Sequence, residues 1–208
     1  KKKSHFEYAG AAGGFIDKYG YPFCRGRIFD TIEEDTGQYN DTIEILWASG
    51  ACFFIKNEVF KTLNGFDDTY FAHMEEIDLC WRAFNANYNT KYVGSSTVYH
   101  VGGATLSNTN PRKTYLNFRN SLFTLVKNTD SNVFARTFIR MVLDGIAGIR
   151  FLLQLKPKFL VAILKAHFSF YKNLNRILKQ RKQLPKRKNY YKTKSIVWSY
   201  YVKKNKTF

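Results

Sequence analysis

Three carboxylate side chains occur within four residues of this chain, at Glu75, Glu76 and Asp78. If this segment is helical, Glu75, Asp78 and Arg82 share one face, since residues three or four positions apart are neighbours on a helix. Glu76 falls on a different, apolar face with Leu79, Cys80 and Ala83. Burial in an apolar cleft raises the pKa of a carboxylate, which suits a general base. The structural alternative is that the helix dipole favours acids in a first turn and that Asp78–Arg82 is an ordinary ion pair.

Two further candidate positions combine a polar or aromatic side chain with glycine. His100 ends an expected strand and precedes two glycines, which leave room for a ligand to approach. Trp47 and Ser49-Gly50 precede an apolar segment, where the indole can stack on a sugar or line an acceptor pocket. Structural roles stay open for both, His100 as a surface histidine and Trp47 as a core residue. The spacing of the histidines fits no zinc site.

The elements that must position these residues alternate between strand and helix. Strands are expected at residues 43–46, 50–55 and 90–99, where β-favouring apolar residues are dense. Helices are expected at residues 57–63, 74–87 and 113–127, with Asn57 as an N-cap, Gly65 as a terminator and Pro111 in a first turn. Residues 4–44 keep neither periodicity for long and are expected to be an extended, largely irregular segment laid over a core. The alternation favours an α/β architecture.

The charge of the chain is distributed unevenly. The net charge is +17, yet residues 1–130 are nearly neutral, and Asp144 is the only acid in residues 131–208. We therefore expect two regions, residues 1–130 and a basic tail at 131–208 with amphipathic helices at 133–155 and 157–182. Such helices suit an anionic membrane surface, although they can equally pack on the first region. Residues from 186 onward are expected to be loosely ordered. No nucleic-acid partner is expected, because no binding motif occurs and the first region has no basic face.

The cysteines and the apolar runs bear on the compartment. Cys24, Cys52 and Cys80 form no CxxC pair, which favours a reduced, cytoplasmic setting. The first residues lack a signal peptide's apolar segment, and no run reaches the ~18 apolar residues that span a bilayer. We expect a cytoplasmic protein.

Four motifs in this order resemble the family 2 inverting glycosyltransferases of bacterial polysaccharide synthesis, including the rhamnosyltransferase-like members. The likeness covers about Tyr8 to Lys127. The motifs are Trp47-Ala48-Ser49-Gly50, Asn64-Gly65-Phe66-Asp67-Asp68, Glu75-Glu76-Ile77-Asp78-Leu79-Cys80-Trp81-Arg82 and Val98-Tyr99-His100-Val101-Gly102-Gly103. The resemblance implies the acceptor-side half of a GT-A fold, and transfer of a sugar with inversion from a nucleotide-sugar donor to a hydroxyl of a glycan or lipid-linked acceptor.

The resemblance also implies roles for individual residues. Glu76 aligns with the family's catalytic base, an Asp, and Glu75 and Asp78 are the neighbouring acidic candidates. Trp47, Ser49 and Gly50 match the acceptor side. The cations assigned to the leaving diphosphate are Arg119 and Arg82, while His100 matches a residue that helps to hold Mg²⁺ or Mn²⁺.

The family's nucleotide-binding strands and Asp-x-Asp motif have no counterpart in the chain. We therefore expect little or no transfer by these 208 residues alone. The alternative is a non-catalytic module that binds a membrane surface or a sugar.

Overall fold

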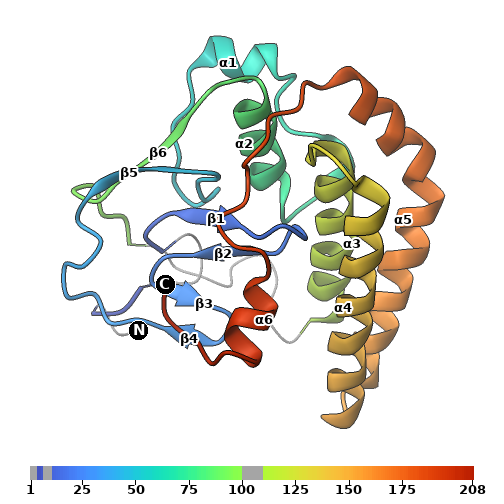
Figure 1. Ribbon diagram of the computed structural model, residues 1–208. Helices are drawn as coiled ribbons and strands as arrows, with labels where there is room; N and C mark the ends of the chain where they lie inside the picture. Colours follow the sequence, from blue (N-terminus) through green and yellow to red (C-terminus); the bar gives the residue numbers. More distant parts are fainter. Residues whose placement is uncertain (1–3, 7–10, 100–109) are drawn as a thin grey trace.

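The computed structural model describes residues 4–6, 11–99 and 110–208 of a mixed α/β protein with small antiparallel sheets (Figure 1). The first sheet has four short strands in chain order. These are β1 (Gly14–Ile16), β2 (Pro22–Cys24), β3 (Arg27–Ile28) and β4 (Thr31–Ile32). Most described residues in 4–44 lie outside strands, in line with the expected largely irregular segment, but these short strands were not expected. Strands of two or three residues are too short to show a period, and a turn at Gly26 with φ +79° joins two of them.

A second sheet consists of two antiparallel strands, β5 (Thr42–Ile45) and β6 (Thr90–Val93). Both lie within or beside expected strands, although β6 ends six residues before the expected boundary at residue 99. The expected strand at residues 50–55 is absent, because that segment forms a loop. Phe53 and Ile55 of this loop pack against the helix that follows, which explains their apolar character without a sheet partner.

Three helices carry most of the polar motifs. They are α1 (Asn57–Thr62), α2 (Glu75–Asn85) and α3 (Pro111–Asn128), and a 3₁₀ turn η1 (Asp68–Tyr70) precedes α2. Gly65 follows α1 with φ +60°, as the glycine signal predicts. Asn57 is the first helical residue and not the expected N-cap, since Lys56 occupies that position. Pro111 begins α3, which is capped by the Asn110 side chain accepting from the Arg112 amide at 2.9 Å.

The C-terminal region contains two long helices and a short one, α4 (Val133–Leu153), α5 (Pro157–Gln183) and α6 (Ile196–Tyr201). Figure 1 shows α3, α4 and α5 side by side as a helical layer beside the small sheets. Leu122 and Phe123 of α3 share one buried core with Phe170 and Ile177 of α5. Residues from both sides of position 130 therefore contribute to the same core.

The segment after residue 186 is ordered and packed, so the expectation of a loose tail is wrong. Tyr190 is buried, and its hydroxyl donates to the Lys18 carbonyl at 2.8 Å. The Ile196 amide donates to the buried Asp17 carboxylate at 3.0 Å. The aromatic and apolar residues between the lysines make these contacts, while the lysines face outward. In the part of the chain that the structure describes, no helix combines the length and apolar content needed to cross a bilayer.

Candidate functional site: an acidic cleft at the start of α2

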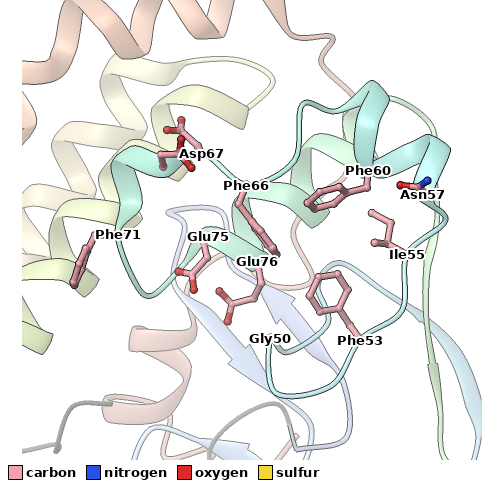
Figure 2. A pocket seen from close by; sticks show the side chains of 11 residues that line it. Gly50, Phe53, Ile55, Asn57, Phe60, Phe66, Asp67, Phe71, Glu75 and Glu76 are labelled. Atoms are coloured by element: carbon pink, nitrogen blue, oxygen red, sulfur yellow. The ribbon is translucent and has the colours of Figure 1, made fainter. Parts of the chain in front are cut away.

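A cleft of about 850 Å³ opens at the N-terminus of α2. Glu75 and Glu76 lie side by side in it and point toward the loop at Gly50 (Figure 2). Gly50 is so close that a Cβ there would lie 3.8 Å from Glu76 Oε1. The cleft thus brings together two of the predicted catalytic residues and one of the predicted acceptor residues.

The backbone that leads into α2 has an unusual conformation. Phe71, His73 and Met74 have φ values of 64°, 69° and 74°, a region that side chains other than glycine rarely adopt. Such conformations persist only where surrounding contacts hold them, and they concentrate at functional sites. This segment therefore sets the position of the two glutamates at considerable local cost.

Two neighbouring residues of α3 hold this strained segment. The buried Asn120 side chain donates to the carbonyls of Tyr70, Ala72 and His73 at 3.0, 2.9 and 2.7 Å. Arg119 Nη2 donates to the carbonyls of Thr69 and Tyr70 at 3.0 Å each. Arg119 therefore braces the backbone beside the cleft, and its expected contact with a diphosphate stays a prediction.

The electrostatics of the glutamate pair suit acid–base chemistry. Burial, and secondly the negative charge of Glu75, raise the pKa of Glu76 from 4.5 to about 7, although backbone hydrogen bonds, including one from Gly50, oppose the change. The Oε2 atoms of Glu75 and Glu76 are both buried and accept no hydrogen bond from the described residues. A carboxylate with a pKa near neutrality and an unused acceptor atom is suited to take a proton from a bound hydroxyl.

The outer wall of the cleft is aromatic. Phe66 makes edge-to-face contacts with Phe60 and Phe53, at centroid distances of 5.5 and 6.2 Å. Figure 2 shows these rings beside Glu76. Sequence reasoning assigned them no role, although Phe66 lies within a motif that supports the resemblance. The sequence feature that could have identified Phe66 as a cleft residue is its position directly before Asp67, which also lines the cleft.

Asp78 and Arg82 lie away from the cleft in a buried ion-pair network. Asp78 is fully buried and accepts from Arg82 Nε, Lys127 Nζ and Asn128 Nδ2, each at 2.8 Å. Arg82 also donates to the carbonyls of Leu63 and Gly65. The ion-pair interpretation of Asp78 and Arg82 is therefore confirmed. Asp78 and Arg82 use their polar atoms in these contacts, and neither residue lines the cleft. Neither is therefore placed to contact a substrate there.

The other predicted residues are placed as follows. Trp47 is buried in the core, where its indole donates to the Phe15 carbonyl at 2.7 Å, in line with the core interpretation. Ser49 Oγ accepts from the Ala51 amide at 3.2 Å within a turn. His100 lies outside the described residues. Among those residues, no group of three or more His, Cys, Asp or Glu side chains could hold a metal ion, so they do not form the expected metal site by themselves.

The fold and cleft define a mixed α/β protein whose candidate site is a pair of glutamates beside an aromatic wall. No protein-family model and no solved structure matches the chain. Two sets of curated proteins match it in part. A 54-residue segment, 26% of the chain, is 39% identical to N-acetylglucosaminyl-diphospho-decaprenol L-rhamnosyltransferase from two strains of Mycobacterium tuberculosis. A 62-residue segment, 30% of the chain, is 36% identical to rhamnosyltransferase WbbL from Escherichia coli K12.

The matches cover 18% of the mycobacterial proteins and 23% of the E. coli protein. The chain thus spans about a fifth of the length of the curated relatives it matches. These partial similarities connect the chain to glycosyltransferases and support sugar transfer in general.

Proposed function

We propose that this chain is the acceptor-side part of a family 2 glycosyltransferase with a GT-A fold. In this proposal the protein transfers a sugar from a nucleotide-sugar donor to a hydroxyl of a glycan or lipid-linked acceptor, with inversion at the anomeric carbon. The observation that carries it is the pair Glu75 and Glu76 in the cleft, with an unused acceptor oxygen on each and a Glu76 pKa of about 7. The partial matches to rhamnosyltransferases support the same reaction class.

The proposed step needs one proton acceptor. The acceptor hydroxyl attacks the anomeric carbon as its proton passes to Glu76, and the bond from that carbon to the diphosphate oxygen breaks. The nucleoside diphosphate leaves with the electron pair. The charge of Glu75 supports the raised pKa of Glu76, while Phe66 and its neighbours supply an apolar surface for the C–H face of a sugar.

Other components of the reaction remain predictions. Mg²⁺ or Mn²⁺ would neutralise charge on the leaving diphosphate, and His100 is the residue expected to help hold it. Proton transfer at Glu76 is proposed without reference to that ion. A location on the cytoplasmic face of a bacterial inner membrane belongs to the proposal as the place where a lipid-linked acceptor is met.

The test is a transfer assay on the natural polypeptide that contains these 208 residues. A nucleotide-activated rhamnose and an N-acetylglucosaminyl-diphospho-polyprenol are the first donor and acceptor, chosen from the names of the partial relatives. We expect Glu76→Gln to lower kcat/KM by roughly 10²–10⁴-fold, the usual contribution of a general base. The wild-type kcat/KM should rise with pH through about 7, because Glu76 must be deprotonated to act.

Glu58→Gln is the matched control, since Glu58 is an exposed carboxylate in α1 that does not line the cleft. It should leave kcat/KM unchanged. Transfer that survives Glu76→Gln and is lost in Glu75→Gln would move the base to Glu75. Sugar binding without any nucleoside diphosphate release would favour the non-catalytic alternative.

A further inference from the structure

Three of the four charged residues of α4, Arg136, Arg140 and Asp144, face the interior of the protein, and the fourth, Arg150, is exposed. Arg140 Nε donates to Asp144 Oδ1 at 2.8 Å, and both side chains are buried. The Tyr21 hydroxyl donates to the same Asp144 oxygen at 2.7 Å, and the Arg140 guanidinium lies over the Tyr21 ring. Arg136, also buried, pairs with Asp130. These contacts fix the rotation of α4 about its axis.

The outward face of α4 is apolar as a consequence. Its large apolar side chains follow each other at spacings of three or four residues, and each is between 48% and 80% exposed. They are Phe134, Phe138, Val142, Ile146, Ile149 and Leu153. A helix on a water-facing surface has the reverse arrangement, with charged residues outside. A continuous exposed apolar surface on a folded protein marks a binding surface.

The neighbouring helix α5 extends this surface. Val161, Leu164 and Phe168 of α5 are exposed at the same spacing. Figure 1 shows α4 and α5 side by side and running in opposite directions. Stacked rings of Phe151 and Phe159, with centroids 5.0 Å apart, join them near the connecting turn.

The charges on the two helices identify the partner of the apolar surface. Exposed cations occur on the same two helices and in the turn between them, at Arg150, Lys156, Lys158, Lys165 and Lys172. In residues 131–208, all of which the structure describes, the only acid is the buried Asp144. A second copy of the chain would bring like charges together, whereas anionic lipid headgroups complement them.

We propose that the outward surface of α4 and α5 binds the interface of a lipid bilayer with anionic headgroups, the helices lying in its plane. Apolar side chains of α4 enter the acyl boundary, and the exposed lysines contact the headgroups. The sequence pattern predicted membrane binding for both amphipathic helices, and the apolar stripe of the second includes Ile163 and Phe170, which the structure buries. This inference goes beyond the proposed reaction, because it requires no catalysis.

The test is co-sedimentation of the natural polypeptide that contains these 208 residues with vesicles of phosphatidylglycerol and phosphatidylethanolamine, or of phosphatidylcholine alone. We expect binding to the anionic vesicles that weakens as salt is raised and only weak binding to phosphatidylcholine. Phe138→Glu should weaken binding by about tenfold or more, because it removes one inserted ring and adds a negative charge. Ile146→Glu should have a similar effect.

Phe54→Glu is the matched control, since Phe54 is a 96% exposed phenylalanine on a loop far along the chain from α4. It makes the same change of residue and charge and should alter binding much less. Circular dichroism and thermal melting should show all variants folded. Equal binding by Phe138→Glu and Phe54→Glu, or no binding by the wild type, would overturn the proposal. A wild-type dimer in light scattering that Phe138→Glu converts to a monomer would also overturn it, by assigning the surface to a second copy.

Discussion

Replacing Glu76 by Gln should stabilise the protein at alkaline pH and have little effect in acid. The pKa of Glu76 rises from 4.5 to about 7 in the folded state, chiefly because of burial and then because of Glu75. A shift of this size corresponds to about 3 kcal/mol of unfavourable ionisation once the group is charged. Glu76 keeps some exposure to the cleft, so solvent screening should reduce the effect to about 1–3 kcal/mol.

The sign follows from the order of the two pKa values. The folded value lies above the unfolded value, so the contribution of Glu76 to stability is fully present below pH 4.5 and is lost as pH rises toward 7. Glutamine keeps the shape of the protonated acid without ionising. The free energy of unfolding of Glu76→Gln minus that of wild type should therefore be about 1–3 kcal/mol larger at pH 8 than at pH 4, which means that the variant is relatively more stable at pH 8.

Urea denaturation of both proteins at pH 4 and pH 8 measures this difference directly. Glu58→Gln serves as the control, because its exposed carboxylate should give a difference that does not depend on pH. Glu75→Gln should lower the raised pKa of Glu76 only in part, since burial is the larger cause of the raised pKa and the charge of Glu75 the smaller one. If the difference for Glu76→Gln is the same at both pH values within about 0.5 kcal/mol, the glutamate is not desolvated and its assignment as a base loses its physical support.

Two further substitutions test the network behind the cleft and the cleft itself. Lys127→Met should destabilise the fold by about 3–5 kcal/mol in urea denaturation, because it leaves the fully buried Asp78 without one of its cations. Adding Asp78→Asn to this variant should recover part of the lost stability. If the double variant recovers none of it, the pairing of Lys127 with Asp78 is contradicted. Gly50→Ala should change the free energy of unfolding by less than about 0.5 kcal/mol, because the new Cβ meets Glu76 only at 3.8 Å, an ordinary contact distance. In the transfer assay it should raise the KM for the acceptor, and an unchanged KM would place the acceptor elsewhere.

Local signals in the sequence were sufficient for the helices and for the residue at the centre of the cleft. Pro111 begins α3 and Gly65 follows α1. Proline fixes its own φ angle at a value that suits a first helical turn, and glycine can adopt the positive φ that ends a helix, whatever the rest of the fold. The helical spacing separated Glu76 from Asp78 and turned it toward an apolar surface, and Glu76 does lie in the cleft. These features depend on residues only a few positions apart.

The sequence pattern could not distinguish the environments of neighbouring polar residues. Glu75 and Asp78 were expected on one helical face, but Glu75 lines the cleft, while Asp78 is buried against Lys127 and Asn128. The partners that bury Asp78 come from α3, about fifty positions later in the chain. Trp47 likewise became a core residue through its hydrogen bond to the distant Phe15 carbonyl.

Taken by itself, the sequence located α1 to α5 to within a few residues, although not α6, and it determined that an acidic pair opens one helix and that the basic charge lies in the C-terminal third. Only the tertiary structure decided which carboxylates share a cleft and which face of α4 is exposed. The contacts of Asp144 with Arg140 and Tyr21 hold these two charges of α4 inside, and Phe134 and Phe138 of the same helix are exposed. The spacing of apolar residues indicates that a helix has two different faces. Which face is buried depends on partners that are distant in sequence.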